Sequence, residues 1–156
     1  MPGTLSFDDL KTRVSDGSID TVLVCFVDMQ GRLTGKRFHA VNFVETAFKE
    51  THCCNYLLAT DLEMATPGGY ASTSWEQGYG DYTMKPDLDT LRLVPWLEGT
   101  AMVLCDVLDH HQKSIAHSPR AMLKTQIARL TEMGFSATMA TELEFFLFEK
   151  SFDDIR

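Results

Sequence analysis

The sequence predicts an α+β fold, because segments of strand-like composition and segments with helical spacing alternate along the N-terminal part of its 156 residues. Thr21–Val27 is a continuous run of mostly β-branched or large apolar residues, which is typical of a buried strand. Residues 6–15 instead carry apolar side chains at helical spacing, with Ser6 placed to cap the first turn and Gly17 to end the last. We therefore expect helices and a sheet in one mixed structure.

The next elements follow from the same two patterns. Leu33–His39 continues beyond a turn at residues 28–31 and forms a hairpin with the first strand, in which Gly31 takes the positive φ of the turn. A second helix is expected over residues 41–49. Residues 61–82 lose regular periodicity and gain glycine, serine and proline, so they predict a long loop. Further strands are predicted at residues 55–60, 83–85, 91–94 and 100–107.

The C-terminal part predicts a helix followed by a strand. Ser118 suits the N-cap, Pro119 suits the first helical position, and Gly134 lies just past the end. Residues 137–149 then have the composition of a strand, and the polar stretch before the helix predicts a domain boundary. The predicted organisation is a leading helix over residues 1–20, a first domain over residues 21–108, and the start of a second domain over residues 109–156.

Composition and charge argue against several classes of protein. The formal net charge is −8 and the isoelectric point is near 5.0, so the phosphate backbone of a nucleic acid would be repelled. No stretch approaches the roughly 20 apolar residues of a membrane span, and no leader pattern is visible, so we expect a cytoplasmic protein without a membrane partner. The four cysteines lack the paired spacing of a zinc site and are expected to be reduced thiols.

Two glutamates carry the clearest chemical signal. The strand period of two places Glu142 and Glu144 on one face of the predicted last strand, between aromatic and aliphatic neighbours. Burying unpaired carboxylates costs several kcal/mol each, so such a pair calls for a cation, and two carboxylates about 7 Å apart at Cα suit magnesium or manganese. The alternative is an edge strand whose glutamates end in solvent or pair with lysine or arginine.

Several segments in a fixed order resemble one family. They are Glu142-Leu143-Glu144-Phe145-Phe146-Leu147-Phe148, Ser118-Pro119-Arg120 before a helix, Pro86-Asp87-Leu88 followed by Thr90-Leu91-Arg92 and Pro95-Trp96, and residues 28–31 with Gly35-Lys36. Together they resemble glutamine synthetase and its relatives over nearly the whole chain. The resemblance implies a β-grasp N-terminal domain, followed by the first helix and strand of the catalytic domain.

The resemblance also implies a reaction and its cofactors. Family members condense glutamate with ammonia or an amine through γ-glutamyl phosphate, with ATP as co-substrate and Mg²⁺ or Mn²⁺ as metal. By this resemblance, Glu142 coordinates the metal beside the ATP phosphates, and Glu144 coordinates the metal beside glutamate. The metals spread the charge of the transferred phosphoryl group. The implied activity is that of a glutamate–ammonia ligase in nitrogen assimilation.

A loop of the N-terminal domain is implied to reach the active site of a neighbouring subunit. Asp61 is the candidate for binding and deprotonating ammonium, with Glu63 as a competitor, and Trp75 is the candidate for shaping the entrance. Typical glutamine synthetases carry glycine-serine-serine after this aspartate, whereas Leu62-Glu63-Met64 follows here. This departure keeps open a γ-glutamyl-polyamine or γ-glutamyl-ethanolamine synthetase.

Further expectations concern assembly and the remaining polar residues. The family implies a homo-oligomeric ring in the full-length form, and no ligase activity for this stretch alone, because further metal ligands are expected beyond Arg156. Arg120 is expected to pair with a carboxylate near the helix start. Histidines at 110, 111 and 117 are read as solvated linker residues. The hypothesis from another class is a non-catalytic β-grasp assembly subunit.

Overall fold

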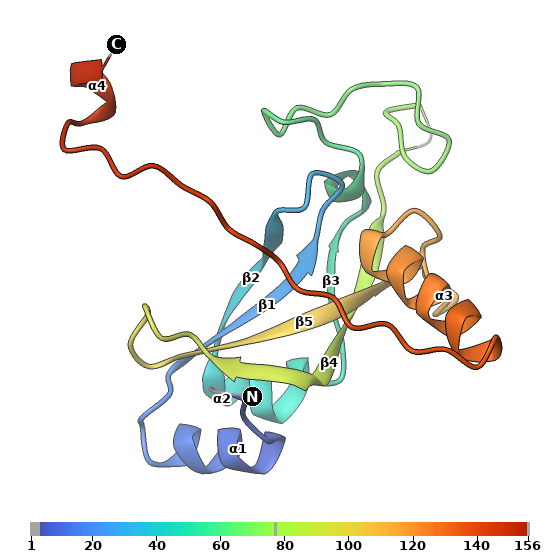
Figure 1. Cartoon of the computed structure of the whole chain (residues 1–156). Coiled ribbons are helices and arrows are strands. Elements are labelled where there is room, and N and C mark those ends of the chain that lie inside the picture. The colour runs from blue at the N-terminus through green and yellow to red at the C-terminus, as the bar shows by residue number, and fades with distance from the viewer. Residues whose placement is uncertain (1–3, 77, 156) are drawn as a thin grey trace.

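A single mixed sheet organises the computed structural model, which describes residues 4–76 and 78–155. Within these residues the sheet has five strands: β1 (Thr21–Val27), β2 (Leu33–His39), β3 (Thr51–Cys54), β4 (Asp81–Leu93) and β5 (Thr100–Leu108). Their order in the sheet is β2-β1-β5-β4-β3 (Figure 1). β1 pairs antiparallel with β2 and parallel with β5, and β4 pairs antiparallel with both β5 and β3. The parallel pair at the centre confirms the α+β, β-grasp-like prediction.

The first hairpin forms where the sequence predicts it. Gly31 has φ +81° in the turn, and the carboxylate of Asp28 accepts the backbone N–H groups of Gln30 and Arg32 at 2.9 Å each. On β2, Gly35 lies opposite Cys25 of β1. A Cβ atom at Gly35 would meet the backbone of β1, 2.8 Å from the Cα of Cys25. The two strands therefore approach more closely here than a larger side chain allows.

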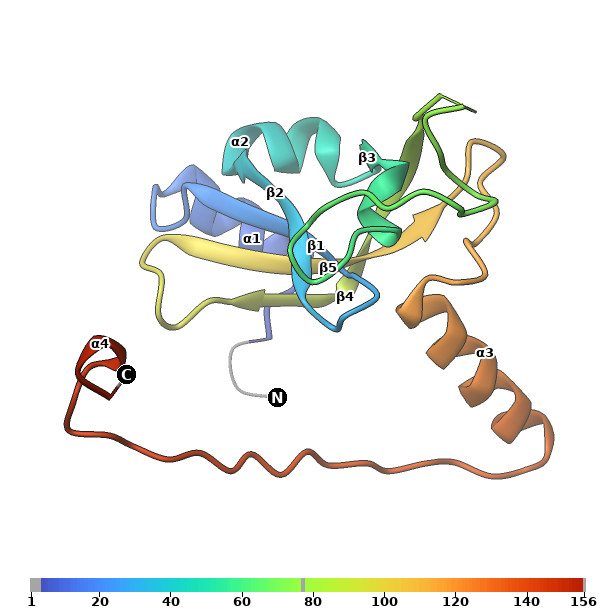
Figure 2. The same cartoon turned by 90° about the horizontal axis from the view of Figure 1, so that it is seen from above.

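Two early helices cover the sheet. α1 (Phe7–Ser15) begins with a capping box between Ser6 and Asp9. α2 (Ala40–Asn42) continues directly into the π-helix η1 (Phe43–Ala47), so the second helix begins one residue before the predicted range of 41–49 and ends two residues before its end. Both helices contribute side chains to one core, and Figure 2 shows from above how α1 and α2 lie against the sheet. The largest fully buried side chains of this core include Leu10, Ile19, Phe26, Phe43, Met84 and Leu91. Burying one such side chain contributes about 1.5–3 kcal/mol.

Two strand predictions were wrong in detail. The strand expected at residues 55–60 is the 3₁₀ helix η2 (Asn55–Leu58), and β3 lies just before it. The N–H of Asn55 still bonds the carbonyl of Gly80 at 2.9 Å, in register with the β3–β4 ladder, after which the chain turns and buries Leu58. Residues 83–85 and 91–94 were expected as separate strands, but β4 spans 83–85 and most of the second segment, with an irregularity between Asp87 and Arg92.

The helix α3 (Pro119–Glu132) is held against the sheet by ion pairs. Arg120 forms an ion pair with Asp87 on β4 and a second one, at 2.9 Å, with Asp106 on β5. Lys124, one turn further on, pairs with Asp106 at 2.6 Å. Burial raises the pKa of Asp106, but the hydrogen bonds from Lys124 and Arg120 and their charges outweigh it, so the net pKa is lowered and the carboxylate stays ionised. The expectation that Arg120 pairs with carboxylates is confirmed.

Replacing Arg120→Met is expected to loosen α3, because it leaves two partly buried carboxylates with Lys124 as their remaining cationic partner among the described residues. Backbone amides of α3 should then exchange with solvent roughly tenfold faster, which corresponds to about 1–2 kcal/mol of local stability. Arg129→Met, in the exposed last turn of the same helix, is the matched control. Equal exchange in the two variants would contradict the assigned role. Hydrogen exchange read by mass spectrometry makes the comparison.

The strand predicted at residues 137–149 does not form. This segment runs as an extended chain away from α3 and ends beyond it in the short helix α4 (Phe152–Ile155), as Figures 1 and 2 both show. Its apolar side chains are open to solvent, with Phe146 at 88% and Leu147 at 91% exposure. A strand needs a neighbour for its backbone N–H and C=O groups, and no other strand of the described residues pairs with it. The expectation of a strand buried on both faces is therefore wrong for this chain.

Within the described residues, no helix is both long enough and apolar enough to cross a membrane.

Candidate functional site

Asp61 lies at the start of the long loop between η2 and β4. The carboxylate oxygen Oδ1 of Asp61 accepts the N–H groups of Glu63 and Ala65, each at 2.9 Å, and the Asp61 N–H bonds the Ala65 carbonyl at 3.0 Å. Met64 completes this tight turn with φ +64°, a conformation that costs energy for a residue other than glycine. One carboxylate oxygen of Asp61 therefore shapes the loop, and the side chain remains exposed.

Trp75 lies in the second half of the same loop and is 75% exposed. Its ring packs edge-on against Tyr79 with centroids 4.8 Å apart, and Tyr79 packs edge-on against Tyr56 of η2 at 5.5 Å. The buried Thr73 donates its hydroxyl to the Asn55 side chain at 2.8 Å. The indole is thus supported by an aromatic cluster while most of its surface faces solvent.

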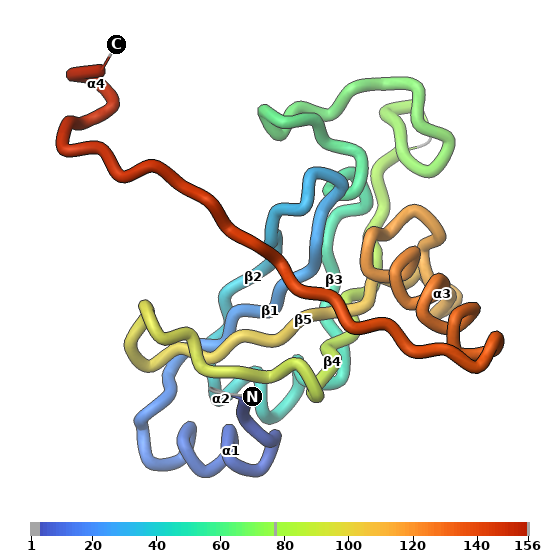
Figure 3. The backbone as a smooth tube through the Cα atoms, viewed as in Figure 1, coloured from blue at the N-terminus to red at the C-terminus, as the bar shows by residue number. Residues whose placement is uncertain are grey.

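The turn of the first hairpin holds the Asp61 loop from the other side. Asp28 is only 1% exposed, and the Nε of Arg32 donates to its Oδ2 at 2.7 Å. Burial raises the pKa of Asp28, but hydrogen bonds from Arg32 and Gln30 and the charge of Arg32 outweigh it and leave the pKa below its usual range. The guanidinium also donates to the carbonyls of Leu62 at 2.9 Å and Asp61 at 3.1 Å. Figure 3 shows the hairpin tip beside this loop.

Sequence reasoning missed Arg32 as part of the candidate site. The residue lies 29 and 30 positions before the two carbonyls that it binds. Its proximity to Asp28 is visible in the sequence, but its reach to the loop depends on how the hairpin and η2 pack.

Glu142 and Glu144 lie on the extended segment after α3 and are both exposed. Neither forms an ion pair with a described residue, and no hydrogen bond or ion pair between described residues joins them to Asp61 or Trp75. In the described part of the chain no three potential ligands gather around one point. The two carboxylates suit a hard divalent cation by donor type, but they are two of the roughly six oxygens that such a cation takes.

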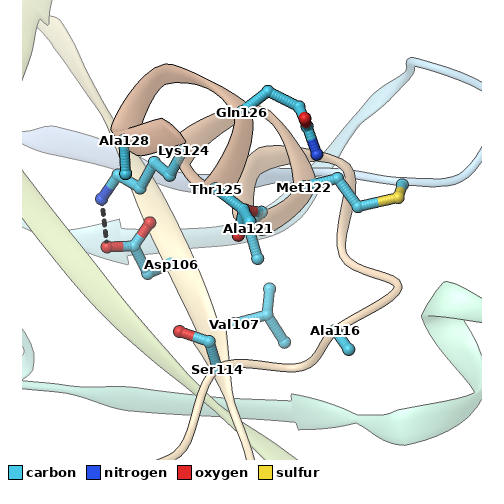
Figure 4. A pocket seen from close by; sticks show the side chains of 10 residues that line it. All are labelled: Asp106, Val107, Ser114, Ala116, Ala121, Met122, Lys124, Thr125, Gln126 and Ala128. Carbon is cyan, nitrogen blue, oxygen red and sulfur yellow. Dashed lines mark hydrogen bonds and ion pairs between the residues drawn. The ribbon is translucent and has the colours of Figure 1, made fainter. Parts of the chain in front are cut away.

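A hollow of about 680 Å³ lies between β5, the segment that follows it, and α3 (Figure 4). Asp106 and Lys124, joined at 2.6 Å, stand at one side, and Met122 stands at another. The hollow contains none of the predicted site residues. Its lining is completed by Val107, Ser114, Ala116, Ala121, Thr125, Gln126 and Ala128.

Comparison with solved structures first defines the fold class. The chain superposes on GmaS, in a structure described as an ADP complex, with a TM-score of 0.60 at 20% sequence identity. The superposition covers 80% of this chain and 26% of the GmaS chain. The fold is therefore a mixed-sheet domain of the type that GmaS contains.

Comparison of sequences then defines the family. The chain is 45% identical over 150 residues, 96% of its length, to gamma-glutamylethanolamide synthetase GlnA4 of Streptomyces coelicolor. It is 36% identical over 149 residues, 94% of its length, to glutamate–isopropylamine ligase of a Pseudomonas species. A family model described as the catalytic domain of glutamine synthetase matches residues 116–155. The chain belongs to the glutamine synthetase family.

The chain spans 32% of the length of each of these two relatives. The match of the catalytic-domain model begins at residue 116, just before α3, and contains Glu142 and Glu144. Ligases of this family use ATP and a divalent metal ion.

Proposed function

We propose that the full-length protein is an ATP-dependent ligase that joins an amine to the γ-carboxyl group of glutamate through γ-glutamyl phosphate. The observation that supports this most is the 45% identity, over 96% of the chain, to a synthetase named for a γ-glutamyl amide. The presence of Glu142 and Glu144 within the matched catalytic-domain segment adds chemical support.

The residues of this chain take distinct roles in the proposal. Glu142 and Glu144 supply carboxylate oxygens to divalent metal, Mg²⁺ or Mn²⁺, which offsets negative charge on phosphate and glutamate when bound. Asp61 accepts a proton from the incoming ammonium group. Its Oδ1 is engaged in the turn, so its second carboxylate oxygen, in an exposed loop, is the one that takes the proton. Trp75 lines the entrance. Glu63, in the same turn as Asp61, is the alternative proton acceptor.

An organic amine is the nucleophile that we favour over ammonia. The two relatives described above are named for ethanolamide and isopropylamine products or substrates. Leu62-Glu63-Met64 also gives the Asp61 loop large side chains, with Leu62 77% and Met64 45% exposed. Exposed apolar groups beside a carboxylate suit an ammonium group that carries a carbon substituent. Ammonia remains the second candidate, from the resemblance to glutamine synthetase itself.

The test is an assay of the full-length protein with ATP, Mg²⁺, glutamate and one nucleophile at a time. We expect phosphate release and a γ-glutamyl product with ethanolamine or a small alkylamine, at a kcat/KM at least tenfold above that for ammonia. A preference for ammonia would make the protein a glutamine synthetase. Product formation with neither class of nucleophile would overturn the proposed ligase and favour a non-catalytic assembly subunit.

We further propose a homo-oligomeric ring in which the Asp61 loop of one subunit serves the metal-binding glutamates of its neighbour. Among the described residues, no hydrogen bond or ion pair joins Glu142 or Glu144 to Asp61 or Trp75. This is compatible with active sites that are shared between subunits. Light scattering that gave a monomeric mass for the active full-length protein would exclude this arrangement.

A further inference from the structure

The Asp61 loop and the first hairpin meet through hydrogen bonds to three consecutive backbone carbonyls. Gln30 donates its side-chain amide to the carbonyl of Thr60 at 3.0 Å, and the two terminal nitrogens of Arg32 donate to Asp61 at 3.1 Å and Leu62 at 2.9 Å. Arg32 also donates to the Gln30 side-chain oxygen at 3.1 Å. We call this set of contacts from Gln30 and Arg32 to the loop the hairpin clamp.

The hairpin clamp is itself rigid. Arg32 is fixed by its ion pair with Asp28, a carboxylate that is 1% exposed and also accepts two backbone N–H groups of the turn. A planar guanidinium with several donors can hold a carboxylate and two carbonyls at once, which an ammonium group on a flexible stem cannot do in the same geometry. The position of the donors is thus set before the loop is bound.

The loop, in contrast, adopts a conformation that is unfavourable by itself. Met64 has φ +64°, and the buried hydroxyl oxygen of Thr60 has no hydrogen-bond partner among the described residues. Both features destabilise the turn that Asp61 caps. The loop therefore depends on contacts from outside, and the hairpin clamp binds it at the residue before Asp61, at Asp61 and at the residue after it.

We infer that Arg32 is a positioning residue for the amine step: through Asp61 and Leu62 it holds the turn that presents the Asp61 and Glu63 carboxylates to the incoming amine. This inference rests on the proposed ligase function. Arg32 touches neither glutamate nor ATP in this role, so its effect should be confined to the nucleophile.

The experiment uses the full-length protein with Arg32→Lys and, separately, Gln30→Leu. Arg32→Lys keeps a positive charge beside the buried Asp28, so the hairpin is not left with an unpaired carboxylate. For Arg32→Lys we expect roughly tenfold faster amide exchange in residues 60–65 and a KM for the amine raised about tenfold, with the KM values for glutamate and ATP within about twofold. Gln30→Leu should show the same pattern with smaller changes.

The matched control is Arg37→Lys, an exposed arginine on β2 of the same hairpin, which should leave both exchange and KM values unchanged. Unchanged loop exchange in both clamp variants would overturn the inference, and so would a parallel rise in the KM values of all three substrates. If the wild-type protein ligates no amine, the proposed function and the amine-positioning role fail together, while the exchange data still decide whether Arg32 holds the loop.

Discussion

Full-length protein carrying Glu142→Gln or Glu144→Gln is expected to lose ligase activity by roughly a hundredfold or more, because each change removes a charged oxygen donor from the proposed metal site. Glutamine keeps the size of the side chain and a neutral carbonyl oxygen, so packing is little altered. The affinity of the same variants for Mn²⁺ should fall about tenfold or more. Electron paramagnetic resonance, in the absence of substrate, measures this affinity. Phosphate release measures the activity.

Glu149→Gln is the control for these variants, since Glu149 is an exposed carboxylate on the same segment. It should leave Mn²⁺ affinity and activity within about twofold of wild type, as surface substitutions usually do. If Glu142→Gln and Glu144→Gln bind Mn²⁺ as tightly as Glu149→Gln, the two glutamates are solvated surface residues. That is the alternative reading of the sequence, in which their side chains end in solvent and hold no metal.

Gly35→Ala is expected to destabilise the N-terminal sheet severely. The added Cβ would lie 2.8 Å from the Cα of Cys25 and 2.9 Å from the carbonyl carbon of Val24, both backbone atoms of β1. These atoms cannot move aside without separating β1 from β2, so the free energy of unfolding should fall by about 3 kcal/mol, or the protein should fail to accumulate in soluble form. Chemical denaturation of the full-length protein, followed by circular dichroism, measures the change.

Gly68→Ala is the matched control, because a Cβ at Gly68 meets no heavy atom within 4 Å. Its effect should stay within about 0.5 kcal/mol. A Gly35→Ala protein as stable as this control would show that the hairpin tolerates a wider separation of its strands.

Local patterns predicted the elements whose signals lie within their own residues. The β-branched run of Thr21–Val27 and the caps around α1 and α3 needed no information from elsewhere, and the structure has these elements within a residue or two of the predicted bounds. The strand expected at residues 55–60 was wrong because Asn55–Leu58 has apolar composition but turns away after pairing with Gly80. Composition alone does not separate a buried turn from a strand.

The last predicted strand was wrong for a different reason. Residues 137–149 have the alternation of a strand, yet a strand is defined by its neighbours, and the described residues provide none for it. The candidate site also combines residues that the sequence predicts with contacts that only tertiary packing reveals. Asp61, Trp75, Glu142 and Glu144 were chosen by resemblance and stay predictions, whereas the contacts of Arg32 come from tertiary packing that no local pattern reveals. The division at residues 108 and 109 also stays a prediction.

The sheet order has a consequence for how the protein is made. β5 is the last strand of the sheet to be synthesised, yet it occupies the middle, between β1 and β4. While the ribosome is still translating the residues before it, the β1–β2 hairpin and the β3–β4 pair exist as separate ribbons, each marginally stable and each with an open edge. Arrival of Thr100–Leu108 closes both edges in one event, so the sheet folds cooperatively once its last strand has been synthesised. Until then the nascent chain presents two open strand edges that can pair wrongly.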